Sequence, residues 1–250
     1  MTRALVRKIP DSFTRALSAV GAASSIDPVL AREQHALYRA ALRVDHEIVV
    51  EADEECPDCV FVEDTAVIVG SKAIITRPGA VTRRRETPPI ADALAPYLDL
   101  VQMQEPATLD GGDVMYVNGK FYVARSARTN AEGIEMLRHW FGRDVVIPVG
   151  LPSGTLHLKC VVSPIDQQTI LLADENLSPH LFPGVEILRV PREETYAANA
   201  VARSSHVVCA AEYPRTIDLL DAAGHHPHPV PTTEVRKADG SLTCQSLVWG

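Results

Sequence analysis

Two stretches of the chain decide its fold: EDTAVIVGSKAIITRPGAVTRRRE (63–86) and GGDVMYVNGKFYVARSARTNAE (111–132). Each contains, in order, a carboxylate, an apolar strand, a turn, a second apolar strand, an Arg, a loop, another Arg and the start of a helix. Gly70-Ser71 and Asn118-Gly119 are residue pairs typical of tight turns between antiparallel strands. The two stretches therefore predict a repeated unit in which a β-hairpin is followed by a helix.

The hairpin turns recur along the chain. Those at Gly70-Ser71, Asn118-Gly119 and 166–168 are spaced 48 residues apart, and another follows after a shorter gap at Ser204-Ser205. A unit of this length implies about five units in 250 residues, which favours a propeller or a solenoid. Closure into a ring would protect most strand edges and leave a central channel.

Helical periodicity is present at 28–42, 130–141 and 213–224, between the apolar strands. Strands and helices alternate, so the class is α/β or α+β. No Gly/Ser-rich linker divides the chain, and 225–234 is its most loop-like stretch. We therefore expect one domain over residues 1–250.

The composition limits the possible partners. Hydrophobic residues make up 46% of the chain, and the formal net charge is −8, which argues against nucleic-acid binding. No apolar run is long enough to span a membrane, and charged residues interrupt the N-terminus, so neither a membrane partner nor a secretory signal is expected. Five cysteines, an odd number, argue against a disulfide framework. These features predict a cytoplasmic protein with reduced thiols.

Carboxylates gather in two places. Asp58, Glu63 and Asp64 lie within seven residues beside an apolar run, which indicates either a solvated loop or a receptor for a guanidinium cation. Asp110 and Asp113 flank two glycines, which indicates either a tight turn or a close approach of the backbone to a ligand.

The thiols have several possible roles. Cys56 and Cys59 form a CxxC pair, but the chain has no second CxxC for a zinc site, and a strand rather than a helix follows. We expect these two to be structural and predict no metal site. Cys244 lies where a loop meets the last strand, so it is either structural or an exposed nucleophile served by a base such as His157.

Taken together, these residues resemble the dimethylarginine dimethylaminohydrolase family of the guanidino-modifying (pentein) superfamily. The resemblance rests on six motifs, in order: PDCVFVEDTA (57–66), ITRPGAVTRRRE (75–86), TLDGGDV (108–114), ARTN (127–130), LHLK (156–159) and DGSLTCQS (239–246). It implies a five-bladed α/β propeller with pseudo-fivefold repeats. It also implies hydrolysis of asymmetric dimethylarginine to L-citrulline and dimethylamine through a covalent thiouronium, without a cofactor.

The resemblance assigns roles by position. Cys244 would be the nucleophile, His157 the general acid and base, and Asp110 the carboxylate that orients His157. The substrate would be bound by the following residues: Asp64 at the guanidinium with Asp58 and Glu63 nearby, Arg83 and Arg128 at the carboxylate, Leu17 on a mobile segment (11–21), and the carbonyl of Ala238 at the α-amine.

Two other functions remain open. An arginine deiminase, or another guanidino hydrolase, would use the same Cys, His and Asp; deiminases of the superfamily are generally much longer. A catalytically silent arginine-binding module would keep the pocket but would not activate Cys244. In each case the partner is a small molecule and the protein is a monomer or a homodimer.

Overall fold

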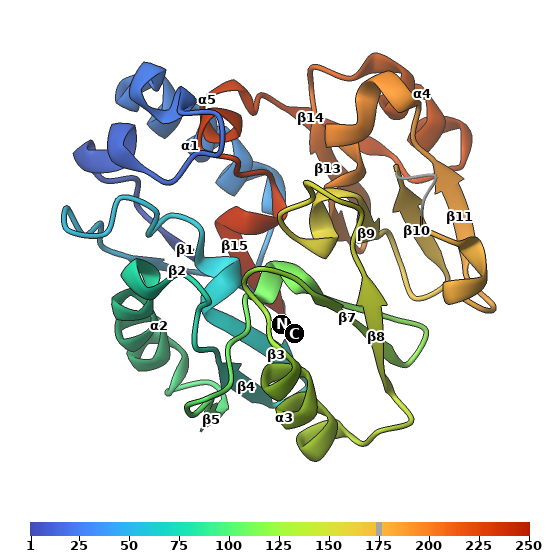
Figure 1. Ribbon diagram of the computed structural model, residues 1–250. Helices are drawn as coiled ribbons and strands as arrows, with labels where there is room; N and C mark the ends of the chain where they lie inside the picture. The colour runs from blue at the N-terminus through green and yellow to red at the C-terminus, as the bar shows by residue number, and fades with distance from the viewer. Residues whose placement is uncertain (174–176) are drawn as a thin grey trace.

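The strands form five three-stranded sheets in the part of the computed structural model that describes the chain, residues 1–173 and 177–250. The sheets are arranged around a common centre (Figure 1). Their strands are β3 (Ala66–Val69), β4 (Lys72–Ile75) and β5 (Asp99–Gln102); β6 (Val114–Val117), β7 (Lys120–Arg125) and β8 (Val146–Gly150); β9 (Val162–Pro164), β10 (Thr169–Leu172) and β11 (Glu186–Arg189); β12 (Val201–Arg203), β13 (His206–Ala210) and β14 (Pro227–Val230); β15 (Ser246–Trp249), β1 (Arg3–Arg7) and β2 (His46–Val50).

Every sheet repeats one pattern of pairing. The first two strands are antiparallel, and the second and third are parallel. A parallel pair requires a crossover connection, which is usually a helix. The crossover helices are α1 (Pro28–Leu42), α2 (Thr87–Leu94), α3 (Ala131–Phe141) and α4 (Pro214–Ala222). The predicted five-bladed α/β propeller and all four predicted hairpin turns are confirmed.

The two ends of the chain complete the fifth sheet. β15 pairs antiparallel with β1, with Leu247 opposite Leu5, so this sheet lacks a hairpin turn and is closed by hydrogen bonds between the termini. Figure 1 places the N- and C-termini side by side at the centre of the molecule. The turn that carries Cys244 is thereby held beside the first strands of the other sheets.

The helices follow the predicted periodicity. The segments predicted at 28–42, 130–141 and 213–224 correspond to α1, α3 and α4. Asp27 caps α1 by accepting the backbone N–H groups of Val29 and Leu30, and Asn130 caps α3 by accepting that of Gly133. Local capping and amphipathic spacing explain why the sequence predicts these helices well.

The prediction of a loop at 225–234 is wrong. It contains strand β14 and the start of helix α5 (Thr233–Lys237). Pro227 and Pro229 make this strand hard to predict from sequence, because proline lacks the N–H group that donates to a neighbouring strand. β14 is an edge strand, so its prolines alternate with the residues that bond to β13 and leave their missing N–H groups on the free edge.

Candidate active site

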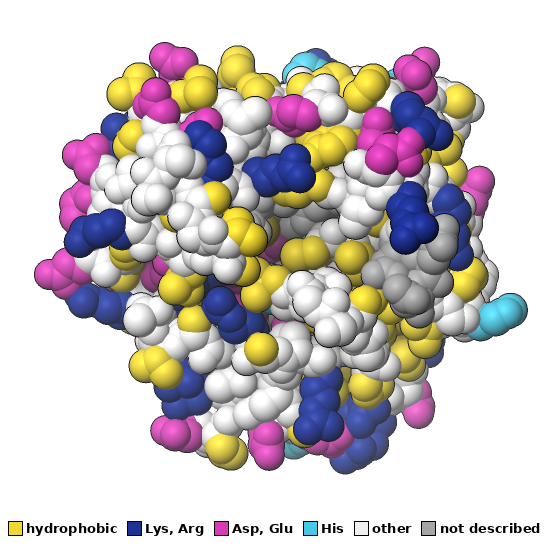
Figure 2. Space-filling view, turned by 45° about the horizontal axis from the view of Figure 1, so that its top comes forward, with side chains coloured by type: hydrophobic (Ala, Val, Ile, Leu, Met, Phe, Trp, Pro, Cys, Tyr) yellow, Lys and Arg dark blue, Asp and Glu magenta, His cyan; other side chains and the backbone are white. Residues whose placement is uncertain are grey.

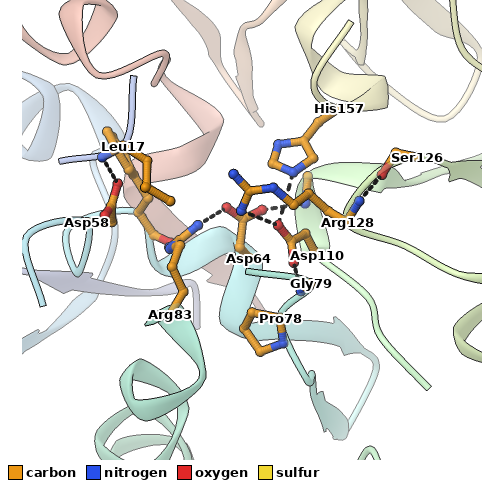
Figure 3. Close-up of polar contacts among 12 residues, drawn as sticks. Leu17, Asp58, Asp64, Pro78, Gly79, Arg83, Asp110, Ser126, Arg128 and His157 are labelled. Carbon is orange, nitrogen blue, oxygen red and sulfur yellow. Dashed lines mark hydrogen bonds and ion pairs between the residues drawn. The ribbon is translucent and has the colours of Figure 1, made fainter. Parts of the chain in front are cut away.

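Each sheet is preceded by a short 3₁₀ turn, and these turns meet at the centre of the ring. They are Val62–Thr65, Gly111–Asp113, Leu158–Cys160, Arg192–Ala198 and Thr243–Gln245. The candidate residues lie on them or directly beside them: Asp64, Asp110, His157 and Cys244. Because the repeats place the same turn at the same point of each blade, residues far apart in sequence come together here (Figure 3).

His157 and Asp110 form a buried pair. The Nε2 atom of His157 lies 3.1 Å from Oδ2 of Asp110, whose other oxygen accepts the backbone N–H of Gly79 at 2.9 Å. Asp110 is fully buried and His157 is 6% exposed. The ring is therefore held by a carboxylate that is itself fixed by the backbone.

Charges around His157 set its protonation. Burial alone would lower the pKa of His157, but Asp64, the hydrogen bond to Asp110, and Asp113 outweigh it and raise the pKa to about 9. Burial would raise the pKa of Asp64, but His157 and Arg83 lower it to about 2. At neutral pH the site therefore contains an imidazolium beside a carboxylate.

Asp64 is held from two sides. Its Oδ2 atom lies 2.5 Å from Nη1 of Arg83, and its Oδ1 atom accepts the backbone N–H of Gly112 at 3.0 Å. Arg83 also donates to Glu86 and to the carbonyl of Phe61, so each of its nitrogens is engaged. In this structure Arg83 orients Asp64.

Arg128 lies on the other side of the pair. Its Nη1 atom is 3.7 Å from Oδ2 of Asp110, and its backbone N–H donates to Ser126. Gly79 packs directly on its backbone, since a Cβ at that glycine would come within 2.3 Å of the Arg128 carbonyl oxygen. The side chain is 19% exposed, which leaves Arg128 more open to an incoming anion than Arg83.

The thiol of Cys244 is partly buried, where the sequence left open either a structural thiol or an exposed nucleophile. Burial raises the pKa of Cys244 well above its ordinary value, and the carboxylates of Glu63 and Asp64 raise it further. The side chain packs against a cluster that includes Phe13, Phe61 and Val235. Cys244 is therefore a neutral thiol beside carboxylates.

The segment that contains Leu17 lies across from these residues (Figure 3). The backbone N–H of Leu17 donates to Asp58 at 3.0 Å, and that of Ala19 donates to Asp239 at 2.5 Å. Leu17 itself is 41% exposed, whereas Asp58 is buried. Ala238, which precedes Asp239, is buried just beyond α5. Two carboxylates thus tie this segment down.

Glu63 faces away from Asp64. Its Oε1 atom lies 2.6 Å from Nζ of Lys159, and its Oε2 atom accepts the hydroxyl of Thr243 at 2.7 Å. The sequence predicts Glu63 near the substrate guanidinium. In the structure its backbone is next to Asp64, but its carboxylate is already engaged by Lys159 and Thr243.

Comparisons with known proteins give this arrangement a family. No family profile matches the chain. It is 37% identical to the N(G),N(G)-dimethylarginine dimethylaminohydrolase of Pseudomonas aeruginosa over 88% of this chain and 89% of the relative. It is 38% identical to the Streptomyces coelicolor enzyme of that name over 98% of this chain and 96% of the relative. The chain belongs to the dimethylarginine dimethylaminohydrolase family.

Solved structures agree. A cysteine-to-serine mutant of the Pseudomonas aeruginosa dimethylaminohydrolase, complexed with citrulline, has a TM-score of 0.92 at 34% identity and covers 99% of this chain and 98% of its own. A histidine-to-glycine variant of a dimethylarginine dimethylaminohydrolase, bound as an adduct with S-methyl-L-thiocitrulline, matches with the same score. The N-terminal domain of an arginine dihydrolase shares the fold with a TM-score of 0.87 at 18% identity.

The geometry of this dimethylaminohydrolase family member suits an organic cation. One donor atom from each of Asp64, Asp110 and His157 lies within 4.8 Å of the others, a spacing that a metal ion could also use. The raised pKa of His157 means that a metal ion would have to displace a proton from its ring at neutral pH. Carboxylates beside fixed hydrogen-bond donors instead match a guanidinium.

The CxxC pair lies outside this cluster. Burial raises the pKa of Cys56 to about 12 and that of Cys59 to about 11, and both are buried free thiols. Neither has the lowered pKa of a reactive thiol.

Sequence reasoning singled out the Gly111-Gly112 pair without giving it a role in the site, and it missed Asn199. Gly112 packs between the catalytic candidates, because a Cβ there would lie 2.9 Å from Nδ1 of His157 and 3.0 Å from Oδ1 of Asp64. Asn199 follows the fourth 3₁₀ turn, donates to the carbonyl of Lys159, and exchanges two hydrogen bonds with Thr243. The repeat could have located Asn199, since it lies two residues before strand β12, as Asp64 and Cys244 lie two residues before β3 and β15.

Proposed function

We propose that this protein hydrolyses asymmetric dimethylarginine to L-citrulline and dimethylamine. The observation that carries the proposal is the convergence of Cys244, the His157–Asp110 pair and Asp64 at the centre of a dimethylaminohydrolase fold. The named relatives and the citrulline complex of one of them support the choice of substrate.

Charge explains how the substrate would activate the thiol. In the resting site Cys244 is neutral because burial raises the pKa of its thiol and the neighbouring carboxylates of Glu63 and Asp64 raise it further. A guanidinium bound at Asp64 adds a positive charge beside the sulfur and favours the thiolate. Sulfur then attacks the guanidinium carbon that the carboxylates hold in place.

The proton balance follows from His157. The imidazolium gives its proton to the leaving nitrogen as the C–N bond breaks, which leaves a thiouronium on Cys244 and a neutral His157. Water then loses one proton to His157 and attacks, and the C–S bond breaks. Citrulline is released and the thiol regains a proton from the water. The proton that the thiol first gave to solvent is balanced by the one that the departed amine takes up to become dimethylammonium.

The remaining candidates bind the rest of the substrate. We assign binding of the substrate's amino-acid carboxylate to Arg128. Arg83 would bind this carboxylate as well only if it released one of its present contacts. Asp58 and Leu17 cover the site, and the carbonyl of Ala238 accepts the α-amine. Glu63 supports the site from behind.

The protein would work as one unit. Residues 1–250 form one catalytic domain in this proposal, since every sheet contributes a turn to the centre. Among the described residues, no helix is both long and apolar enough to cross a membrane. A cytoplasmic location and a monomer or homodimer stay predictions.

The test is citrulline formation from asymmetric dimethylarginine and from arginine, side by side, with Cys244→Ser as the control. We expect turnover of the methylated substrate, and none in the variant, whose thermal unfolding should stay close to that of the wild type. Preference for arginine would indicate a deiminase. Turnover by Cys244→Ser would contradict the covalent route, and failure of a haloacetamidine to label Cys244 would favour a silent binding module.

A further inference from the structure

A cavity lies behind the candidate active site, on the axis of the ring. Its volume is about 270 Å³, and the first strand of every sheet contributes to its wall. The wall is mostly apolar, with Val67, Val114, Val201 and Leu247 among its residues. Burial decreases along the strands toward Tyr116, which is 42% exposed and lies at the open end.

The floor of this cavity is the back of the active site. Glu63, Gly111, Lys159 and Thr243 form it, and each lies one or two residues from Asp64, Asp110, His157 or Cys244. The Lys159–Glu63 ion pair and the Glu63–Thr243 hydrogen bond close the floor. A single layer of side chains thus separates the cavity from the reacting groups.

The proposed reaction requires a path for two small molecules. The amine must leave, and water must enter, while the rest of the substrate is still bonded to Cys244. In the structure Asp58 and Asp239 hold the backbone of the segment around Leu17 at the front of the site. A small amine therefore needs a path that does not release the covalently held part.

We propose that the rear cavity binds the dimethylammonium leaving group and is its exit. The methyl groups of dimethylammonium would lie against the apolar wall, and its N–H groups would face the carboxylate of Glu63. The Lys159–Glu63 ion pair separates the cavity from the active site and would open to let the amine pass. Water takes the same path in the opposite direction. This inference rests on the proposed function, because it assigns a place to one of the products.

The first experiment measures binding of dimethylammonium chloride to the full chain in the presence of saturating L-citrulline, by saturation-transfer NMR on the methyl protons. We expect the two molecules to bind together. Ala202→Trp, which fills the cavity from the partly exposed strand β12, should weaken the binding of dimethylammonium by about tenfold or more. Ala222→Trp, at an exposed position on α4, is the matched control and should bind like the wild type.

Competition between dimethylammonium and citrulline, unchanged binding in Ala202→Trp, or no binding to the wild type would each overturn the proposal. Ala202→Leu replaces the Trp variant if the latter does not fold.

A second measurement separates this inference from the proposed function. In Ala202→Trp, turnover of asymmetric dimethylarginine should fall more than that of monomethylarginine, whose leaving amine is smaller; equal changes would contradict the exit route. A wild-type protein that forms no citrulline from either would overturn the proposed function, while the dimethylammonium titration would still test the cavity.

Discussion

Glu63 and Asp64 are consecutive in sequence, yet their carboxylates lie on opposite sides of the layer between the candidate active site and the rear cavity. Asp64 pairs with Arg83 on the active-site side, and Glu63 pairs with Lys159 at the floor of the rear cavity. Both lie on the 3₁₀ turn Val62–Thr65, where three residues complete a turn and neighbours point in different directions. Two acids in one motif therefore have two roles. In the space-filling view of Figure 2, the face of the molecule that is turned toward the reader is hollowed near its middle.

The Asp110–His157 hydrogen bond should be essential for turnover. Asp110→Asn keeps an oxygen that can accept from Gly79 but removes the charge that supports the imidazolium. We expect kcat to fall by about 10²- to 10⁴-fold. Citrulline assays over a range of pH values measure this effect, and the pKa of His157, followed by NMR, should fall with it. Asp92→Asn, at an exposed position on α2, is the control; an unchanged His157 pKa in Asp110→Asn would contradict the prediction.

Gly112 should tolerate no side chain. In Gly112→Ala the new Cβ would press on the His157 ring and on Asp64, so one of them must move. A displacement of this size should lower kcat by about a hundredfold and destabilise the fold by about 1–3 kcal/mol. Gly150→Ala, whose Cβ would meet nothing within 4 Å, should match the wild type in both assays. Full activity in Gly112→Ala would show that the site has more room than the structure gives it.

Arg128 should act on binding of the substrate carboxylate. Removal of its guanidinium in Arg128→Ala should raise KM for asymmetric dimethylarginine by about ten- to a hundredfold, the effect of one lost charge-assisted contact. A decarboxylated analogue should be affected much less, and Arg125→Ala, at an exposed position on β7, should change neither. If the analogue suffers equally, the carboxylate assignment is wrong.

His157 should make stability depend on pH. Its pKa of about 9 in the folded chain lies above its ordinary value of 6.5, so its contribution is complete below pH 6.5 and is lost as the pH rises through 9. The free energy of unfolding should fall across this window by up to about 3 kcal/mol. Urea unfolding at several pH values measures this slope, which should flatten in His157→Gln. Parallel slopes in the two proteins would contradict the raised pKa.

Local chemistry in the sequence determined the repeat and its elements. Turn residues such as Gly70-Ser71 and Asn118-Gly119 act within a few residues, and so do the periodic spacing and the caps of α1 and α3. These features predicted the hairpins, the helices and about five repeated units in a propeller or a solenoid, and the family resemblance implied the five-bladed ring. The order of short motifs added the family and the candidates Cys244, His157 and Asp110.

Only the tertiary structure decided how these candidates meet. The neutral thiol of Cys244, the charged ring of His157 and the rearward direction of Glu63 each depend on groups from other repeats. The Arg83–Asp64 ion pair lies within one repeat, but it joins residues 19 positions apart that only folding brings together. The edge position that permits prolines in β14 likewise depends on a neighbouring strand. Burial and electrostatic interactions act through space between residues distant in sequence, so the pattern of one repeat carries no information about them.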